Sequence, residues 1–209
     1  MGLLDNSNGG YPPNQVRFVE LGPENPNKTI GVIKFPEEWI PTAGFFALMH
    51  RMLCGLYFAD YMGMTPVVDS WTNCAYEEKD AINGTKNVFE YYFEPLSSVS
   101  MPSALNSKCV VKILNPNMDY ALFKHGCEWF DMSEKYIKEM GRLYRDYIRF
   151  NKKTRIQMEQ DTSKVLKGKK TLGIHFRGTD YVIGAVGHPV ALQVEDYFDE
   201  IDKAIDQCG

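Results

Sequence analysis

The residue types that can bind or act on an anion gather in one short stretch of the chain: His175, Arg177, Thr179 and Asp180. They follow Thr171-Leu-Gly-Ile, an apolar run of the kind that forms a buried strand. Because side chains alternate along a strand, His175 and Arg177 are expected to point to the same side. Ligands of open α/β sheets bind beyond the carboxyl ends of the strands. The stretch therefore predicts the anion-binding edge of an active site. The alternative is a structural ion pair between Arg177 and Asp180 that fixes the loop.

The elements that must position this stretch alternate between strands and helices. Apolar runs predict strands at 29–35, 65–69 and 109–114, a further strand from Thr171 onward, and a short β-like piece at 16–21. Helical spacing of apolar residues predicts helices at 45–62, from Asp131 to about residue 166 with a break, and at 194–208. Residues 87–96 are aromatic-rich and fit either a helix or a strand. The strand, buried helix and strand between residues 29 and 69 form a βαβ pattern, which predicts an α/β fold with a mainly parallel sheet.

The same pattern predicts a division of the chain into three parts. Residues 1–27 are rich in Gly, Pro and Asn and are expected to form a loose N-terminal leader. Residues 28–168 are expected to form an α/β domain. Residues 169–209 contain one strand and one helix, which bury too little surface to be stable alone. We therefore expect a second, Rossmann-like domain that begins at about residue 169 and is incomplete.

The composition excludes several classes of function. The net charge is −4, and no run of Lys and Arg offers a site for nucleic acid. No window is apolar enough to span a membrane. The five cysteines are scattered, without Cys-x-x-Cys spacing, which favours reduced thiols in a cytoplasmic protein. No P-loop, dinucleotide-binding glycine motif or nucleophile elbow is present, so ATPase, oxidoreductase and acyl-transfer functions are weak alternatives.

A second candidate site lies at the start of the helix expected at 45–62. The first residues of a helix have backbone N–H groups without an intrahelical partner, and these can bind an anion. Gly44, Phe45 and Phe46 would provide them. The alternative is a simple turn before a core helix.

Two of these stretches resemble a known family. His175-Phe-Arg-Gly-Thr-Asp is similar to the motif of the fucosyltransferase superfamily, which includes alpha-1,6-fucosyltransferases, nodulation fucosyltransferases and protein O-fucosyltransferases. Gly44-Phe-Phe-Ala-Leu-Met-His, followed by Thr65-Pro-Val-Val-Asp, resembles the first glycine-containing loop, helix and strand of its bacterial members. Asn87-Val-Phe-Glu-Tyr-Tyr-Phe-Glu-Pro resembles a further segment of the same proteins.

The resemblance implies a two-domain glycosyltransferase of the GT-B type that takes fucose or a related sugar from a GDP-sugar. It implies that Arg177 binds the phosphates of the donor and acts in catalysis, a role that suits a permanently charged guanidinium. The expected donor-binding residues are those of the two motifs: His175, Arg177, Thr179, Asp180, Gly44, Phe45 and Phe46. The partners implied are a nucleotide sugar and a glycan acceptor. Many alpha-1,6 members have a second arginine where this chain has Gly178, so its donor or acceptor preference can differ.

No metal or other cofactor is expected, because the Asp-x-Asp pattern that holds a divalent ion on a nucleotide sugar is absent and the family is metal-independent. Two alternatives to an inverting fucosyltransferase stay open. The first is a truncated, non-catalytic α/β domain that binds a glycan or a partner. The second and weaker one is a hydrolase that uses His175 and Asp180.

Overall fold

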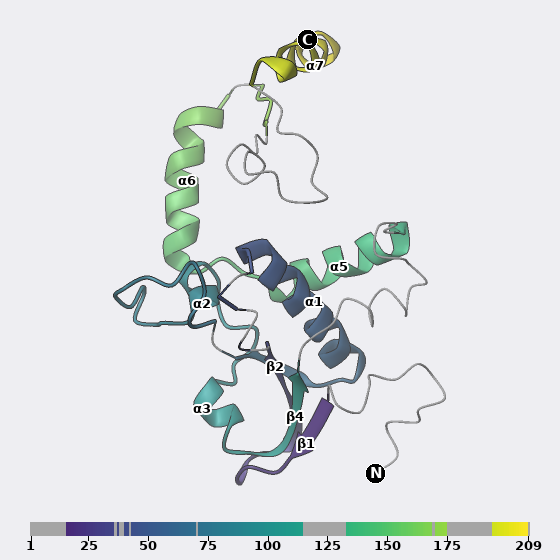
Figure 1. Cartoon of the computed structure of the whole chain (residues 1–209), viewed down its shortest axis with the longest axis vertical. Coiled ribbons are helices and arrows are strands. Elements are labelled where there is room, and N and C mark those ends of the chain that lie inside the picture. Colours follow the sequence, from purple (N-terminus) through teal and green to yellow (C-terminus); the bar gives the residue numbers. More distant parts are fainter. Residues whose placement is uncertain are drawn as a thin grey trace. The chain divides into compact units, whose positions relative to one another are not determined.

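The structure is a computed structural model that describes residues 16–35, 37, 40–41, 43–69, 71–114, 133–168, 170–174 and 194–208. The chain divides into two compact units, Met1–Ile156 and Gln157–Gly209. Figure 1 shows the elements of each unit along the chain. The sheet belongs to the first unit. The described part of the second unit is helix and loop.

The sheet of the first unit has four strands in the order β1-β4-β2-β3. Their bounds are β1 Val16–Val19, β2 Glu24–Lys34, β3 Thr65–Val68 and β4 Ser107–Leu114. β2 runs parallel to both of its neighbours, and β1 is antiparallel to β4 at one edge. The predicted α/β fold with a mainly parallel sheet is therefore confirmed, with one antiparallel edge strand in addition.

The first of the three parallel strands, β2, lies between the other two. The chain leaves β2 through α1 (Phe45–Tyr61) to reach β3 on one side. It then returns through α2 (Val88–Tyr92) and α3 (Met101–Ala104) to reach β4 on the other side. Right-handed crossovers in opposite directions place their helices on opposite faces of a sheet. The result is a doubly wound arrangement, in which ligands bind near the point where the connections diverge.

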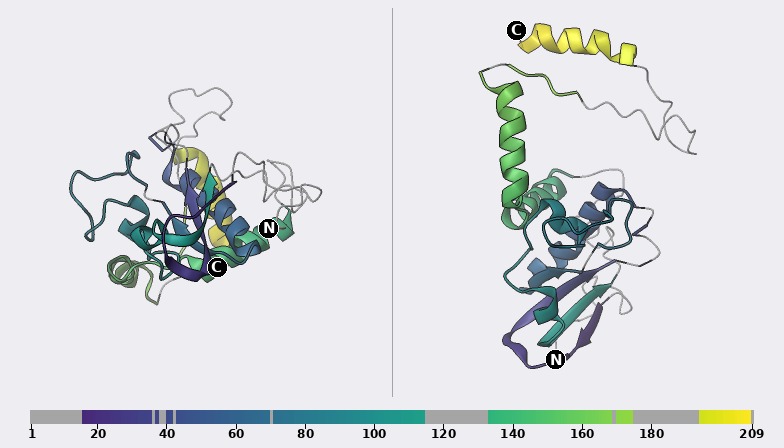
Figure 2. Two further views of the ribbon diagram at one scale, coloured as in Figure 1. Left: turned by 90° about the horizontal axis from the view of Figure 1, so that it is seen from below. Right: turned by 90° about the vertical axis from the view of Figure 1, so that its left-hand side faces the viewer.

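The side chains confirm that the two faces of the sheet are covered by different helices. α1 and α5 (Glu134–Tyr147) pack on the face that carries Ile33, Val111 and Ile113. The opposite face packs against α3 and the chain before it, and its buried residues are Ile30, Val32, Val67, Val99, Ala104 and Val110. Figure 2 gives two further views of these layers. Successive buried side chains of β2 and β4 point to opposite faces of the sheet, as expected for strands that are covered on both sides.

The α1 helix approaches the sheet closely at one glycine. A Cβ atom on Gly31 would lie 3.2 Å from Ala59 Cβ and 3.3 Å from Met64 Cβ. Gly63, predicted to end this helix, has a φ of 65°. The N–H of Gly63 donates to the Asp60 carbonyl, and that of Met64 to the Ala59 carbonyl, the pair of bonds that closes a Schellman cap.

A charged network holds α5 against α1. Arg142 lies 2.6 Å from Asp60 and 2.7 Å from Glu139, and the Tyr147 hydroxyl donates to Asp60 at 2.5 Å. Burial, followed by the hydrogen bond to Asp60, raises the pKa of Tyr147 to about 12. The network fixes the position of α5 along α1.

The start of α5 differs from the prediction. The helix was expected to begin at Asp131, but its N-cap is Ser133, whose hydroxyl accepts from the Tyr136 N–H at 3.2 Å. Either side chain type can cap a helix, so composition alone does not distinguish the two. The predicted break is confirmed: α5 ends at Tyr147 and α6 runs over Lys152–Leu166.

Residues 16–27 also differ from the expected loose leader. β1 and the first part of β2 lie in this range, and both are paired in the sheet. Asn25 holds this region by donating to the hydroxyls of Ser103 and Ser107. The high content of Gly, Pro and Asn here marks a bulged strand, with Asn25 at a φ of 47°.

The described part of the second unit contains most of α6, the 3₁₀ helix η3 (Val194–Tyr197) and α7 (Phe198–Cys208). The last two confirm the helix predicted at 194–208. Residues 171–174 were expected to begin a strand, but they are coil, and Leu172 and Ile174 are exposed. No helix in the described residues is long and apolar enough to cross a membrane.

Candidate functional site

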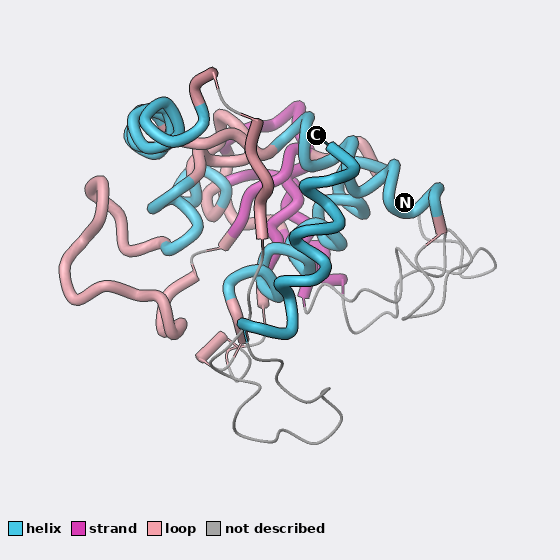
Figure 3. The backbone as a smooth tube through the Cα atoms, turned by 90° about the horizontal axis from the view of Figure 1, so that it is seen from above, coloured by secondary structure: helices cyan, strands magenta, loops and turns pink. Residues whose placement is uncertain are grey.

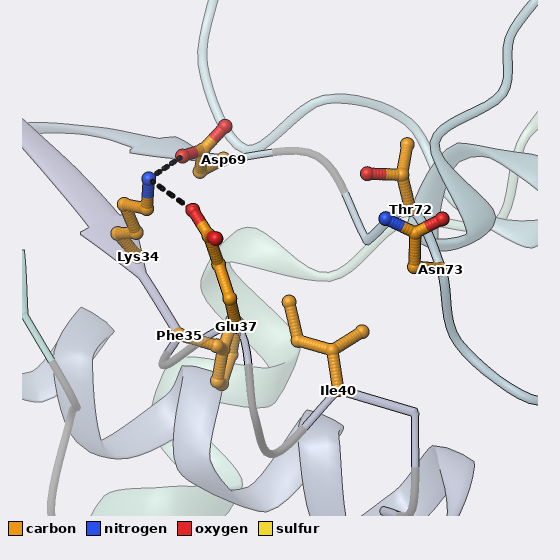
Figure 4. Close-up of a pocket in the computed structure, with 7 residues that line it drawn as sticks. All are labelled: Lys34, Phe35, Glu37, Ile40, Asp69, Thr72 and Asn73. Atoms are coloured by element: carbon orange, nitrogen blue, oxygen red, sulfur yellow. Dashed lines mark ion pairs between the residues drawn. The ribbon is translucent and has the colours of Figure 1, made fainter.

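A pocket of about 320 Å³ opens beyond the carboxyl ends of β2 and β3. Figure 4 shows the residues that line it: Lys34, Phe35, Glu37, Ile40, Asp69, Thr72 and Asn73. Lys34 is the last residue of β2, and Asp69 directly follows β3. The Asp69 N–H donates to the Ile33 carbonyl at 2.9 Å, which continues the pairing of the two strands to the pocket. This is the edge of the sheet at which α/β proteins bind their ligands.

The charged groups of the pocket are arranged around one ammonium. Lys34 Nζ lies 3.6 Å from Glu37 Oε1 and 3.9 Å from Asp69 Oδ2. The side chain of Glu37 is 86% exposed and that of Asp69 25% exposed. Ion pairs at this separation and exposure contribute little to stability. Two carboxylates and one ammonium give the described lining of the pocket a small negative charge.

The remaining polar groups of the pocket come from the loop after β3. The connection from β3 to α2 is made of loop and turns, as Figure 3 shows. Asn73 in this loop has a φ of 61°, a conformation that Asn tolerates better than most residues. Its N–H donates to Glu77 Oε2 at 2.5 Å, which fixes the backbone beside the pocket. Thr72 and Asn73 therefore line the pocket from a locally constrained backbone.

Gly44 occupies the N-cap of α1 and leaves the helix start without a side-chain cap. Its carbonyl accepts from the N–H groups of Ala47 and Leu48, at 2.9 and 3.1 Å. A Cβ atom at this position would meet only the Tyr76 hydroxyl, at 3.8 Å, and the φ of −64° suits any residue. Glycine is therefore not demanded here by backbone conformation or packing. The effect of having no side chain is that the first-turn N–H groups receive no cap from this position.

Phe45 lies at the centre of a group of aromatic rings. On its inner side it packs on Trp71 and Phe93, with ring centroids 5.6 and 6.3 Å away. Three more rings surround it, with centroids at 5.5, 5.7 and 5.5 Å: Phe46, Tyr76 and Tyr92. These three, which we call the outer aromatic cluster, are 80%, 43% and 45% exposed. They come from α1, the loop after β3 and the end of α2.

The capped N-terminus of α2 supports this aromatic group. Asn87 is the N-cap of α2, and its side-chain oxygen accepts from the N–H groups of Phe89 and Trp71 at 3.3 and 3.0 Å. One side chain thus ties the loop after β3 to the start of α2. The sequence left this segment undecided between helix and strand.

The predicted site residues fall into two groups. Gly44, Phe45 and Phe46 lie together at the start of α1, in the same unit as the pocket. The other four, His175, Arg177, Thr179 and Asp180, lie outside the described residues. Their role stays a prediction.

Sequence reasoning missed most of the pocket and of the outer aromatic cluster. Asp69 was visible in the sequence as a carboxylate at the end of a strand, although an exposed turn residue was the favoured interpretation. Lys34 could have been found in the same way, because it ends the other strand of the βαβ unit. Tyr76 and Tyr92 carry no such signal, since only the folded loop brings them to Phe45.

Comparison of the chain with protein-family models, with curated proteins and with solved structures finds no match. The resemblance to fucosyltransferases therefore depends on the motifs in the sequence.

Proposed function

We propose that this chain is a glycosyltransferase of the GT-B type, which moves fucose or a related sugar from a GDP-sugar to a glycan acceptor in the cytoplasm. The observation that supports it most is positional. The first stretch that resembles the fucosyltransferases forms α1 and β3, and its glycine loop follows β2, which is parallel to β3. The motif with Arg177 follows it in the order found in the family.

In this proposal each of the two stretches contributes donor-binding residues. Arg177 forms two bonds to the diphosphate and neutralises the charge that builds on it as it leaves. His175, Thr179 and Asp180 contact the nucleotide or the sugar. The uncapped backbone N–H groups at Gly44, Phe45 and Phe46 give the first unit a helix start that can bind an anionic group.

The reaction is a direct displacement with inversion and needs no metal. The oxygen of an acceptor hydroxyl attacks the anomeric carbon, and the bond from that carbon to the diphosphate oxygen breaks. The electron pair of that bond leaves with GDP, and the acceptor proton passes to a base. Because the donor is activated already, the main task of the protein is to orient both substrates and to stabilise the leaving group.

The proposal is tested by GDP-fucose turnover with the full chain and its Arg177→Ala variant. Loss of a charged phosphate contact is expected to lower turnover on the order of a hundredfold or more. Arg155→Ala is the matched control, because Arg155 is an exposed arginine with only a 3.8 Å ion pair to Glu94. Equal turnover by the wild type and Arg177→Ala would refute the assignment.

A second candidate is a non-catalytic α/β domain that binds a glycan. The outer aromatic cluster and the polar pocket favour it, because both belong to a unit that has its own hydrophobic core. Calorimetry with GDP distinguishes the two: the transferase binds GDP, and the glycan-binding domain does not.

A further inference from the structure

We infer that the outer aromatic cluster of Phe46, Tyr76 and Tyr92, together with the pocket beyond β2 and β3, is a carbohydrate-binding site. The apolar C–H face of a sugar ring stacks on the cluster, and its hydroxyl groups bond the polar side chains of the pocket. Sugar binding is inferred from the geometry alone. Only the identification of that sugar as the acceptor rests on the proposed function.

The first step is that the exposure of these rings is not a by-product of packing. The core contact of this region is made by Phe45, which packs on the buried Trp71 and Phe93. The outer rings stay partly exposed although each packs on Phe45, and Phe46 keeps 80% of its surface in water. Single exposed aromatic residues are common, but three that pack on one ring from separate elements offer apolar surface to a ligand.

The second step is that the cluster and the pocket share their supporting elements. The loop after β3 contributes Thr72 and Asn73 to the pocket and Tyr76 to the cluster. Trp71 packs on Phe35 of the pocket at 5.8 Å and on Phe45, which supports the cluster, at 5.6 Å, between ring centroids. One buried indole therefore contacts a residue of the pocket and the ring on which the cluster packs.

The third step concerns charge. An anion is disfavoured because the described lining of the pocket contains the carboxylates Glu37 and Asp69 and a single cation, Lys34. A cation is disfavoured as well, because the Lys34 ammonium already lies between the two carboxylates. What is left is a dense set of hydrogen-bond donors and acceptors with little net charge. That set fits a neutral ligand with many hydroxyl groups.

The fourth step concerns the rings themselves. Tyrosine presents an apolar ring with a polar end, and sugars likewise combine an apolar face with a hydroxyl rim. The hydroxyl groups of Tyr76 and Tyr92 have no hydrogen bond to another described residue, so both are available to a ligand. An apolar peptide or lipid would leave these hydroxyls and the pocket without partners, at a cost in affinity.

The experiment measures binding of cellotetraose, chitotetraose and mannotetraose to the full chain without donor, by saturation-transfer NMR and calorimetry. At least one of the three is expected to bind. Replacing Tyr76 or Tyr92 by Ala is expected to weaken binding about tenfold, the scale of one aromatic contact. Tyr92→Phe keeps the ring and is expected to lose less. Tyr144→Ala, at an exposed tyrosine of α5, is the control and is expected to bind as the wild type.

The inference would be overturned if no tetrasaccharide binds at millimolar concentration, or if the Tyr76→Ala and Tyr92→Ala variants bind as tightly as the wild type. Competition by tetramethylammonium would also overturn it, because the site would then be one for a cation. The Phe46→Ala variant controls for misfolding, because the removal of so exposed a ring of the cluster is expected to have little effect on stability. The outcome is separable from that of the transferase proposal. Sugar binding without GDP-fucose turnover would support the carbohydrate-binding site and contradict the transferase proposal. GDP-fucose turnover without sugar binding at the cluster would support the transferase proposal and contradict the carbohydrate-binding site.

Discussion

At the scale of single residues, His50 shows how burial sets a protonation state. It lies on α1, and its Nε2 is 2.5 Å from the Tyr136 hydroxyl of α5. Burial, and to a lesser extent the charge of Arg51, lowers the pKa of His50 below its ordinary value of 6.5. The histidine therefore stays neutral inside the first unit at a pH where a free histidine is already protonated. It acts as a satisfied structural residue between two helices.

This shift predicts a pH dependence of stability. Between the lowered pKa of the folded state and about pH 6.5, the unfolded chain binds more protons at His50 than the folded chain does, so the free energy of unfolding falls as the pH is lowered through this range. Above that pH the two states bind the same number of protons, and the effect disappears. Urea unfolding at pH 5.5 and 7.5 is the measurement, with His50→Gln as the comparison. The variant is expected to lose part of the pH dependence; an identical dependence in both proteins would contradict this role.

Two adjacent phenylalanines of α1 give a second prediction. Phe45→Ala is expected to lower the free energy of unfolding by about 2–3 kcal/mol, because it empties the centre of the aromatic group. Phe46→Ala is expected to change it by no more than about 0.5 kcal/mol, because the ring is exposed. Urea unfolding of the two variants checks the pair. Equal changes in the free energy of unfolding would mean that Phe45 contributes no more to stability than Phe46 does.

At the scale of elements, the contact between α1 and β2 depends on the absence of a side chain at Gly31. Gly31→Val is expected to cost about 1–3 kcal/mol of stability, because its Cβ would press on Ala59 and Met64. Gly173→Ala is the control, since a Cβ there meets no atom within 4 Å. Thermal unfolding of both variants is the measurement. A wild-type melting temperature for Gly31→Val would show that α1 can shift away from the sheet without cost.

Elements with a strong local signal could be predicted from the sequence. The apolar run of α1 and the branched residues of β2, β3 and β4 identified these elements, and the βαβ order identified a parallel sheet. The antiparallel partner of β4 could not be predicted, because the pairing of β1 depends on tertiary contacts. The run at 171–174 shows the converse: its composition is strand-like, but these residues are coil, because strand propensity depends on context.

The candidate site divides in the same way. Gly44 and Asp69 could be placed at the carboxyl edge from element order alone. The outer aromatic cluster could not be placed, since Tyr76 belongs to a loop and Tyr92 to a helix that the sequence left undecided. Loops carry function because a scaffold positions them, and that positioning is a property of the fold.

At the scale of the whole chain, buried side chains are unevenly distributed. Every described residue classed as buried lies in the first unit, and α6 and α7 contribute none. Hydrogen exchange is expected to show slow amides in β2, β4 and α1, and fast exchange in α6 and α7. Protection in residues 198–208 equal to that in β2 would contradict this distribution.

The position of Trp71 has a further consequence for measurement. Its indole is completely buried, and its N–H has no hydrogen-bond partner among the described residues. Phe45 packs both on this indole and on the exposed ring of Tyr92. An indole in this place is an intrinsic optical reporter: its emission stays blue, as in any apolar core, while its intensity responds to displacement of the neighbouring ring. In a protein with Trp39 and Trp129 replaced by Phe, the fluorescence of Trp71 alone is expected to follow occupancy of the outer aromatic cluster without an added label.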